Sequence, residues 1–146
     1  MSFTTESILA QWREDAEIDP IELGDASRNN PKLHAKYLEQ FFIERARLLR
    51  LQDQLKRMKK IRFEYWEGKL SYEELKERGW EPQPLKVLRT DLPMYLEADE
   101  VLAEMSLKVG LQAEKVNVLD MIMKHINNRG FSIKSAIEWE RFRAGG

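Results

Sequence analysis

Apolar residues recur at helical spacing along most of the chain, whereas the two-residue alternation of strands is almost absent. Over residues 93–129, one such series alternates steps of three and four positions without a slip. This spacing is typical of the seam of a coiled coil or of a long helical hairpin. Gln112 is its only strongly polar member, and one buried polar residue can fix the register or the partner number. The members of the seam are Tyr95, Ala98, Leu102, Met105, Val109, Gln112, Val116, Leu119, Met123 and Ile126.

A second long helix is predicted over residues 31–68. Asn30 and Pro31 have the pattern of an N-cap followed by a first helical residue. No Gly or Pro interrupts the chain from there to Gly68, which lies where a C-terminal cap is expected. We therefore expect one uninterrupted helix. Its apolar stripe is formed by Leu48, Leu51, Leu55 and Met58.

Shorter helical segments are predicted around these two helices. The N-terminal arm, about residues 1–30, contains a short helix that a proline-containing turn ends. The connector, residues 69–92, contains a small helix that Ser71 caps. A helix stop at residues 128–130 precedes a last helix over residues 131–146.

These elements predict an all-α fold in a single helical domain over residues 1–146. Two helices of about 35 residues would each be roughly 50 Å long, so we expect them to pack antiparallel and to leave apolar surface for contacts between subunits. A second apolar stripe on the later helix supports this, because one neighbour cannot cover both stripes. That stripe comprises Leu107, Leu111, Val118 and Ile122. The later helix is therefore predicted to form the oligomer interface, through Leu102, Met105, Val109, Val116, Leu119, Met123 and Ile126.

Composition narrows the class of protein. The chain has 146 residues and a mass of 17.3 kDa, and 34% of its residues are charged, against about 25% in an average domain. This surplus of charge fits long solvated helices. The absence of cysteine excludes thiol catalysis, iron–sulfur clusters and zinc–thiolate sites. No apolar run exceeds three residues and no signal-peptide pattern opens the chain, so we expect a soluble intracellular protein without a membrane span.

Charge is distributed unevenly, although the net charge is only −1. Residues 44–62 contain eight basic and two acidic side chains, a balance of +6, whereas residues 14–25 contain six acids and no base. A basic block of this kind attracts polyanions by neutralising phosphates and releasing counterions. Charge alone leaves open that the block is only a solvated helix face. The basic residues of the block are Arg45, Arg47, Arg50, Lys56, Arg57, Lys59, Lys60 and Arg62.

The sequence offers little for catalysis. His34 and His125, the only histidines, lie on different predicted helices with no ligand pattern near them. Neither a Walker motif nor a G-x-G-x-x-G phosphate loop is present. We therefore predict a binding protein without catalytic residues, metal ligands or cofactors. A hydrolase that uses surface carboxylates is the weaker alternative.

Residues 56–68 join a basic cluster to three aromatic rings. Binding of single-stranded nucleic acid uses this combination, because cations follow the phosphates while flat rings stack on unpaired bases. The alternative is that Phe63, Tyr65 and Trp66 pack at the end of the helix, and that the cations only keep the protein soluble. Arg62 projects close to the apolar stripe of its helix, so an interface position stays open for it.

A signature is visible in residues 60–68, which read Lys-Ile-Arg-Phe-Glu-Tyr-Trp-Glu-Gly. They fit the pattern Lys-x-Arg-apolar-acid-Tyr-aromatic-x-Gly of the UvsY recombination mediators of T-even-like bacteriophages. Residues 129–134 and 140–145 resemble the C-terminal ending of the same family. The chain length and the order of a basic helix before a second long helix also agree. On this resemblance the chain is identified as a cyanophage-like member of that family.

The resemblance implies a function and a set of partners. UvsY-type proteins bind single-stranded DNA, form ring-like homo-oligomers, and contact both a RecA-like recombinase and a single-strand-binding protein. They help the recombinase to load onto DNA that the single-strand-binding protein covers, in homologous recombination, repair and recombination-dependent replication. The chain would then be a non-enzymatic mediator in the host cell cytoplasm, in a ring of six or seven subunits.

The resemblance also implies particular DNA-binding residues. By position, Lys60 and Arg62 would carry the DNA-contacting basic pair of the family, and Tyr65 or Trp66 would be stacking platforms. The alternative function is a structural coiled-coil adaptor whose basic helix binds an acidic protein partner. From the charge pattern we add two cations to the predicted DNA-binding set, Arg57 and Lys59.

Overall fold

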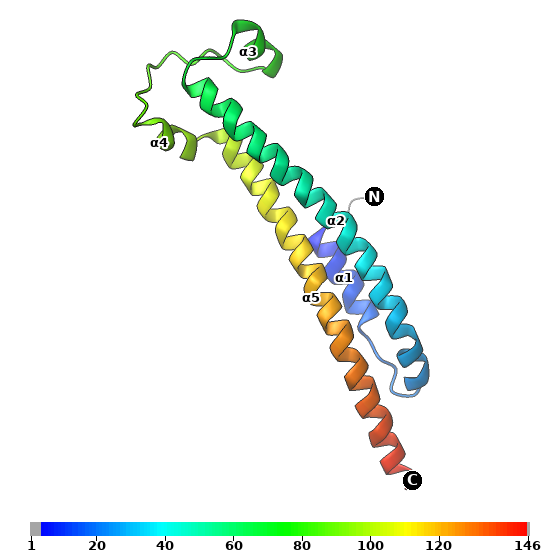
Figure 1. The fold of residues 1–146 in the computed structure, drawn as a ribbon. Helices are drawn as coiled ribbons and strands as arrows, with labels where there is room; N and C mark the ends of the chain where they lie inside the picture. Colours follow the sequence, from blue (N-terminus) through cyan, green and yellow to red (C-terminus); the bar gives the residue numbers. More distant parts are fainter. Residues whose placement is uncertain (1–3, 146) are drawn as a thin grey trace. The chain divides into compact units, whose positions relative to one another are not determined.

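The structure, a computed structural model, describes residues 4–145. Residues 1–3 of the predicted N-terminal arm and residue 146 of the predicted last helix lie outside the described residues. The described residues form helices and no strand, so the predicted all-α fold is confirmed (Figure 1). The helices are α1 (Thr5–Asp15), α2 (Leu23–Trp66), α3 (Tyr72–Arg78), α4 (Leu92–Glu97) and α5 (Glu100–Arg143).

The chain packs as two compact units, where the sequence predicts one domain. Unit 1 contains the described residues up to Arg47 and those from Gln112 onward, and unit 2 contains Leu48–Leu111. Each unit includes part of α2 and part of α5. Unit 1 adds α1 to these two helices, whereas unit 2 adds α3, α4 and the connector between them.

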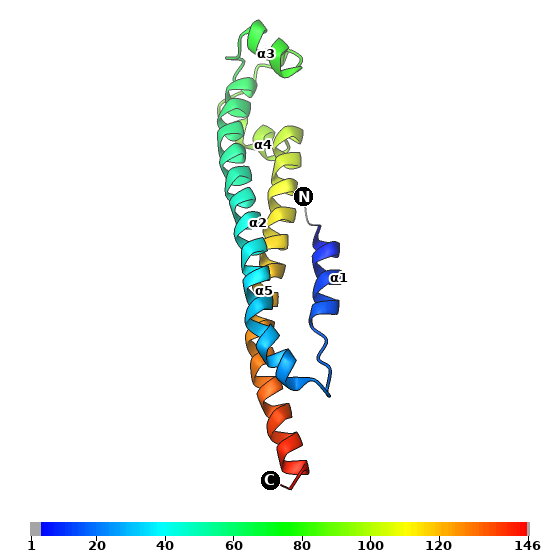
Figure 2. The ribbon, with the colours of Figure 1, turned by 90° about the vertical axis from the view of Figure 1, so that its right-hand side faces the viewer.

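Unit 1 is held together by one apolar core to which three helices contribute. Figures 1 and 2 show α1 alongside α2 and α5. Tyr37 of α2 is fully buried, its ring meets Trp12 edge-on at a centroid distance of 5.6 Å, and its hydroxyl donates to Asp15 at 2.7 Å. Burial, together with the contact to Asp15, raises the pKa of Tyr37 above its ordinary value of 10.0. The buried core residues are Ile8, Leu33, Tyr37, Leu119, Ile122, Met123 and Ile126.

In unit 1, α2 and α5 run antiparallel as predicted, and a buried polar contact sets their register. Asn30 contacts Ile126, whereas Glu44, later in α2, contacts Gln112, earlier in α5. Gln112 donates to the backbone carbonyl of Glu44 at 2.8 Å and to its carboxylate at 2.7 Å. Glu44 is fully buried, and Lys115 lies 3.5 Å from the same carboxylate. The one polar position of the seam therefore aligns two helices of the same chain.

The apolar seam of α5, which the sequence predicts as the oligomer interface, also packs inside the chain. A side chain that its own chain encloses offers no surface to a neighbouring subunit. The buried members of the predicted interface are Leu102, Leu119, Met123 and Ile126. The half-buried members are Met105, Val109 and Val116. Of the second stripe, only Leu107 and Leu111 stay exposed.

The helix α2 begins at Leu23 rather than at Pro31. The predicted cap residue, Asn30, forms hydrogen bonds with α5 instead. The Asn30 side chain donates to the Ile126 carbonyl at 2.9 Å and accepts from Arg129 at 3.0 Å. Pro31 consequently lies inside the helix, where it lacks the N–H that would bond the carbonyl four residues earlier. Tertiary hydrogen bonds to α5 thus override a local cap signal.

The helix α5 continues to Arg143 instead of stopping at residues 128–130. Gly130 does not have the positive φ of a helix-ending glycine. Arg129 is buried and donates to the Glu17 carbonyl at 2.9 Å, and Ile133, in the following turn, is buried as well. A glycine inside a helix costs about 1 kcal/mol, which these tertiary contacts outweigh. A Cβ at position 130 would lie 3.4 Å from the side-chain nitrogen of Asn30, so α2 packs closely against α5 at this glycine.

In unit 2, the predicted caps of the connector helix are confirmed, but the long heptad helix starts later than expected. Ser71 forms a capping box with Glu74, and Gly79 ends α3 in the left-handed conformation. Residues 92–97 form the separate helix α4, and a break at Ala98 and Asp99 precedes α5. The Asp99 carboxylate accepts from the Leu102 amide at 2.9 Å, which is the hydrogen bond of an N-cap residue.

Leu119→Ala should destabilise the protein strongly. Truncating a fully buried leucine costs about 2–5 kcal/mol, because the core loses contacts and keeps a cavity. Urea unfolding followed by helical circular dichroism measures the change. Met121→Ala, on an exposed position of the same helix and unit, is the matched control and should change the free energy of unfolding by less than about 0.5 kcal/mol. Equal effects of the two substitutions would contradict this core.

Candidate nucleic-acid interface

Arg50 and, further along the helix, a cluster of four cations project from the part of α2 that lies in unit 2, and all five are exposed. The cluster is the candidate surface. Arg57 pairs with Asp53 one turn earlier at 3.0 Å, and 78% of its side chain is exposed. Exposed pairs of this kind contribute little, so the guanidinium stays available to a stronger anion. Among residues 4–145, no acid forms an ion pair with the other three cations of the cluster. We call this cluster the basic face: Lys56, Arg57, Lys59 and Lys60.

The basic face lies away from the apolar stripe of α2. At 100° per residue, its four side chains span about 160° of the helix circumference. The stripe residues Leu51, Leu55 and Met58 fill the other side and are half-buried. A row of cations on one side of a helix can neutralise successive phosphates of a single strand.

Arg62 does not belong to the basic face, although the sequence predicts it as a DNA contact. Residues two positions apart on a helix point about 200° apart, so Lys60 and Arg62 face opposite sides. Arg62 is only 7% exposed, and its Nε and Nη2 each lie 2.8 Å from one carboxylate oxygen of Asp99. Its charge is therefore compensated inside the chain.

The partner of Arg62 is an ionised carboxylate. Burial alone would raise the pKa of Asp99, but hydrogen bonds from Arg62, from the Leu102 amide and from Trp66 hold that pKa below its ordinary value of 3.8. The Trp66 indole donates to the same oxygen as Arg62, at 2.8 Å. Asp99 thus joins the end of α2 to the first turn of α5 while it is charged.

Aromatic rings surround the guanidinium of Arg62. Its central carbon lies 4.1 Å from the ring centre of Tyr65 and 4.5 Å from that of Trp80. Tyr65 and Trp80 meet edge-on at 5.7 Å, and Trp66 packs on Tyr95 at 5.0 Å. The predicted stacking platforms, Tyr65 and Trp66, are half-buried in these contacts. This arrangement is the helix-end packing that the sequence leaves open as the alternative.

Hydrogen bonds fasten the connector to the same end of α2. The Tyr65 hydroxyl donates to the Glu81 carbonyl at 2.8 Å, and the Gln83 side chain donates to the Trp66 carbonyl at 2.9 Å. A cavity of about 440 Å³ lies beside these groups. It is lined by the rings of Tyr65, Trp66 and Trp80, by Arg62 and by acids that include Glu81. We call the group that meets here the Arg62 network: Arg62, Tyr65, Trp66, Trp80 and Asp99.

Two members of the Arg62 network are not singled out by the sequence. Asp99 stands in an acidic run with Glu97 and Glu100, which resembles an ordinary solvated helix face. Its spacing of three residues before Leu102 is an N-cap signal, but the regular heptad seam runs through it and favours a continuous helix. Trp80 follows a helix-ending glycine, and no local pattern indicates its packing on Arg62.

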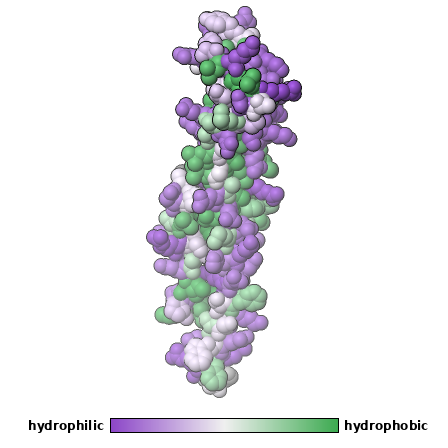
Figure 3. Space-filling view, turned by 90° about the vertical axis from the view of Figure 1, so that its left-hand side faces the viewer, coloured by the Kyte–Doolittle hydropathy of each residue, from purple (hydrophilic) through white to green (hydrophobic). Residues whose placement is uncertain are grey.

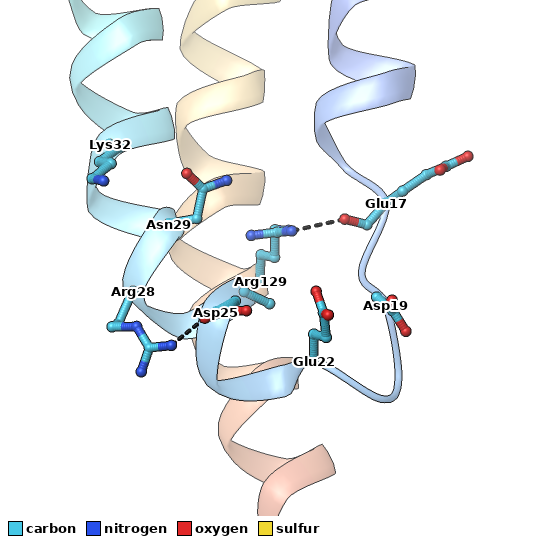
Figure 4. Close-up of a pocket in the computed structure, with 9 residues that line it drawn as sticks. Glu17, Asp19, Glu22, Asp25, Arg28, Asn29, Lys32 and Arg129 are labelled. Atoms are coloured by element: carbon cyan, nitrogen blue, oxygen red, sulfur yellow. Dashed lines mark hydrogen bonds and ion pairs between the residues drawn. The ribbon is translucent and has the colours of Figure 1, made fainter.

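A second cavity, of about 400 Å³, lies in unit 1 beside the acidic segment of the sequence. Figure 4 shows Arg129 pointing toward Glu17, whose carbonyl accepts its hydrogen bond, and Arg28 paired with Asp25. Four acids and three bases line this cavity. Its charge is unlike that of a phosphate site, so the basic face remains the candidate surface for a polyanion.

Apolar side chains also reach the surface. Figure 3 shows hydrophobic side chains interspersed with hydrophilic ones on the face that it displays. In unit 2, Leu107 and Leu111 lie one turn apart on α5 and are 62% and 57% exposed. In unit 1, large apolar residues are exposed near the end of α5. They are Phe131, Trp139 and Phe142.

None of the helices formed by residues 4–145 is long and apolar enough to cross a membrane. Within the same part of the chain, no three His, Asp or Glu side chains are grouped as the ligands of a metal ion would be.

Comparisons with known proteins point to one family. The family described as "Recombination, repair and ssDNA binding protein UvsY" matches residues 11–146. Crystal structures of the bacteriophage T4 recombination mediator protein UvsY are similar in fold at 21% sequence identity. Lattice type II has a TM-score of 0.84 and covers 98% of this chain and 99% of that chain. Lattice type IV has a TM-score of 0.84, with coverage of 96% and 99%, and lattice type I has 0.80, with 92% and 97%. No curated protein sequence matches the chain.

Asp99→Asn should reduce stability at neutral pH and remove part of its acid dependence. Because the folded pKa of Asp99 lies below 3.8, its ionised form stabilises the fold above that ordinary value, and this stabilisation disappears as the pH falls through the folded pKa. Urea unfolding of wild type and variant between pH 7 and pH 3 measures the difference, which should be largest at the neutral end. Glu104→Gln, an exposed acid of the same helix, is the control. A wild-type advantage that stays constant down to pH 3 would contradict an ionised Asp99.

Proposed function

Because the chain belongs to the UvsY family of recombination, repair and single-stranded-DNA-binding proteins, we propose that it is a non-enzymatic recombination mediator. In this role it binds single-stranded DNA through the basic face. It helps to load a RecA-like recombinase onto DNA covered by single-strand-binding protein. It acts in homologous recombination, repair and recombination-dependent replication, in the cytoplasm of the host cell.

The exposure of the basic face is the observation that carries the DNA-binding part of this proposal. Lys56 and Lys60 are separated by about 6 Å along the helix axis at 1.5 Å per residue, a distance comparable to that between neighbouring phosphates of an extended strand. Lys59 and Arg57 widen the row on either side. Contacts of this kind neutralise phosphates without reading bases, which suits a protein that must act on any sequence.

We propose that the protein works as a ring-like homo-oligomer of six or seven subunits. Because four of the seven seam residues predicted at the interface are buried within the chain, we place the contact between subunits on apolar side chains that remain exposed. Leu107 and Leu111 are the best placed of these in unit 2. A ring repeats the basic face in every subunit, so a long strand that contacts several subunits gains affinity through a high effective concentration.

Lys59→Ala/Lys60→Ala should weaken binding to oligo-dT and make it less dependent on salt. Each lost phosphate contact reduces the slope of log affinity against log salt by about 0.7 for single-stranded DNA, so two should reduce it by about 1.4 for each subunit engaged. A salt titration of fluorescent oligo-dT measures the slope. Similar losses are expected for oligomers of other base sequences, because phosphate contacts do not specify sequence.

Lys108→Ala is the matched control, since this exposed lysine lies in unit 2 on the other long helix. It should leave the salt slope unchanged. If the double variant and this control have the same slope as wild type, the basic face does not contact DNA. A protein that fails to bind oligo-dT but binds acidic proteins would favour the coiled-coil adaptor instead.

Leu107→Asp/Leu111→Asp should disrupt the oligomer while each chain stays folded. Both side chains are exposed in the single chain, so the change barely affects the core, whereas a carboxylate in an apolar contact between subunits is strongly unfavourable. Native mass spectrometry reports the subunit number, and circular dichroism reports the fold. Affinity for a long oligo-dT should fall by about 100-fold or more as multivalency is lost. An unchanged mass would remove this surface from the proposed interface.

A further inference from the structure

Arg62 connects three segments of unit 2 that meet at the end of α2. It pairs with Asp99 before the first turn of α5, it lies over the rings of Tyr65 of its own helix and Trp80 of the connector, and its partner carboxylate also accepts from Trp66. The basic face ends only two residues earlier, at Lys60. Arg62 is therefore a cation whose charge is paired inside the chain, directly after a row of cations that face solvent.

We infer that Arg62 is a positioning residue and not a phosphate contact. It holds the connector and the start of α5 against the end of α2, and it thereby keeps Lys59 and Lys60 on an ordered helix. This inference rests on the proposed DNA-binding role of the basic face. Arg62 then affects the affinity for DNA although its guanidinium does not contact the DNA.

The first argument is the cost of releasing Arg62. To reach a phosphate, the guanidinium must leave the Asp99 carboxylate, which is 2% exposed. A buried charge would then remain unpaired, and breaking a buried pair in this way is strongly unfavourable. A phosphate contact at the surface is screened by water and salt, so it contributes less favourable free energy than the buried pair loses. The ion pair therefore stays closed when DNA binds.

The second argument is what the Arg62 network supports. The last turn of α2 contains no basic residue that would stabilise its C-terminal carbonyls. The end of the helix relies instead on Gly68, which adopts a positive φ of 75°, and on the bond from Gln83 to the Trp66 carbonyl. Stacking of Trp80 on Arg62 keeps the connector, and hence Gln83, in place. Without it, the turns that carry Lys59 and Lys60 fray more easily.

The third argument is that the site uses properties that only arginine has. The guanidinium is planar, donates from Nε and Nη2 in a fixed fork, and packs over the rings of Tyr65 and Trp80. Lysine keeps the charge but lacks the fork and the flat surface. Non-specific neutralisation of phosphates depends mainly on the charge, which lysine also provides, whereas a positioning role needs the shape. Arg62→Lys therefore separates the two roles.

The test compares Arg62→Lys and Arg62→Gln with wild type in salt titrations of oligo-dT binding. We expect both variants to bind about five-fold more weakly, the effect of losing one hydrogen bond of average net strength, with the salt slope of wild type. Lys60→Ala, measured beside them, should reduce the slope. Wild-type affinity of Arg62→Lys together with a reduced slope of Arg62→Gln would overturn the inference, because charge alone would then account for Arg62.

Asp99→Asn is a second variant that keeps the inference falsifiable if the Arg62 variants fold poorly. It removes a negative charge, so simple electrostatics predicts tighter binding to DNA. The positioning role predicts weaker binding, because the anchor of Arg62 is lost. Glu104→Gln removes the same charge from an exposed position of α5 and should bind at least as tightly as wild type. Tighter binding by Asp99→Asn would contradict the positioning role.

Limited trypsin digestion of the full-length protein tests the network without DNA. The connector carries exposed sites at Lys86 and Arg89, and Arg62→Lys should be cut there faster than wild type, while Lys60→Ala should not. An unchanged cutting rate in Arg62→Lys would overturn the inference even if DNA affinity falls. If wild type itself does not bind oligo-dT, the proposed function fails, and the digestion still decides whether Arg62 holds the connector.

Discussion

The buried ion pair between Arg62 and Asp99 is the contact on which unit 2 depends. Charged groups lose their hydration when they are buried, and removing one partner of such a pair costs about 3–5 kcal/mol. Asp99 can accept from Arg62, from Trp66 and from the Leu102 amide only if the chain leaves the helical path just before α5. The pair therefore decides where α5 begins. Unit 1 obeys the same constraint, because its buried Glu44 bonds to Gln112 and Lys115 of α5 as well as to Arg47 of its own helix.

The burial of Arg62 against Asp99 divides the cations of α2 into two groups, one that faces solvent and one that is paired inside the chain. Lys60 and Arg62 are adjacent members of one short motif, but a helix turns about 200° between them. One side chain therefore faces solvent and the other faces Asp99. In the proposed function, the outward group provides a charge that phosphates can neutralise, and the inward group holds the helix on which that charge is presented. The Lys-x-Arg pair of this helix would then combine binding with support, which a count of positive charges does not reveal.

The apolar surface is divided in a comparable way. A heptad seam predicts a partner helix but does not say whether that helix belongs to the same chain. Here α2 and α1 supply the partner surface in unit 1, so Leu119 and Ile126 contribute to the fold of each chain. In the proposed oligomer, self-association depends on side chains that lie outside the seam, such as Leu107. Fold stability and the proposed subunit contact therefore use different positions of α5, and substitutions can separate them.

The amino-acid sequence by itself determined the all-α class, the caps of the connector helix and the position of the basic face, because helical periodicity, capping boxes and local charge act over a few residues. It also carried the family signature around residues 60–68. Only the tertiary structure decided the ends of the long helices and the roles of the charged residues. Asn30 and Gly130 have strong local signals for a helix start and a helix stop, yet contacts between α2 and α5 override both. Likewise, the burial of Arg62 depends on Trp80 and Asp99, which lie 18 and 37 positions away in the sequence. Local patterns cannot specify such partners, because the energy of a buried charge is set by whatever the fold brings next to it.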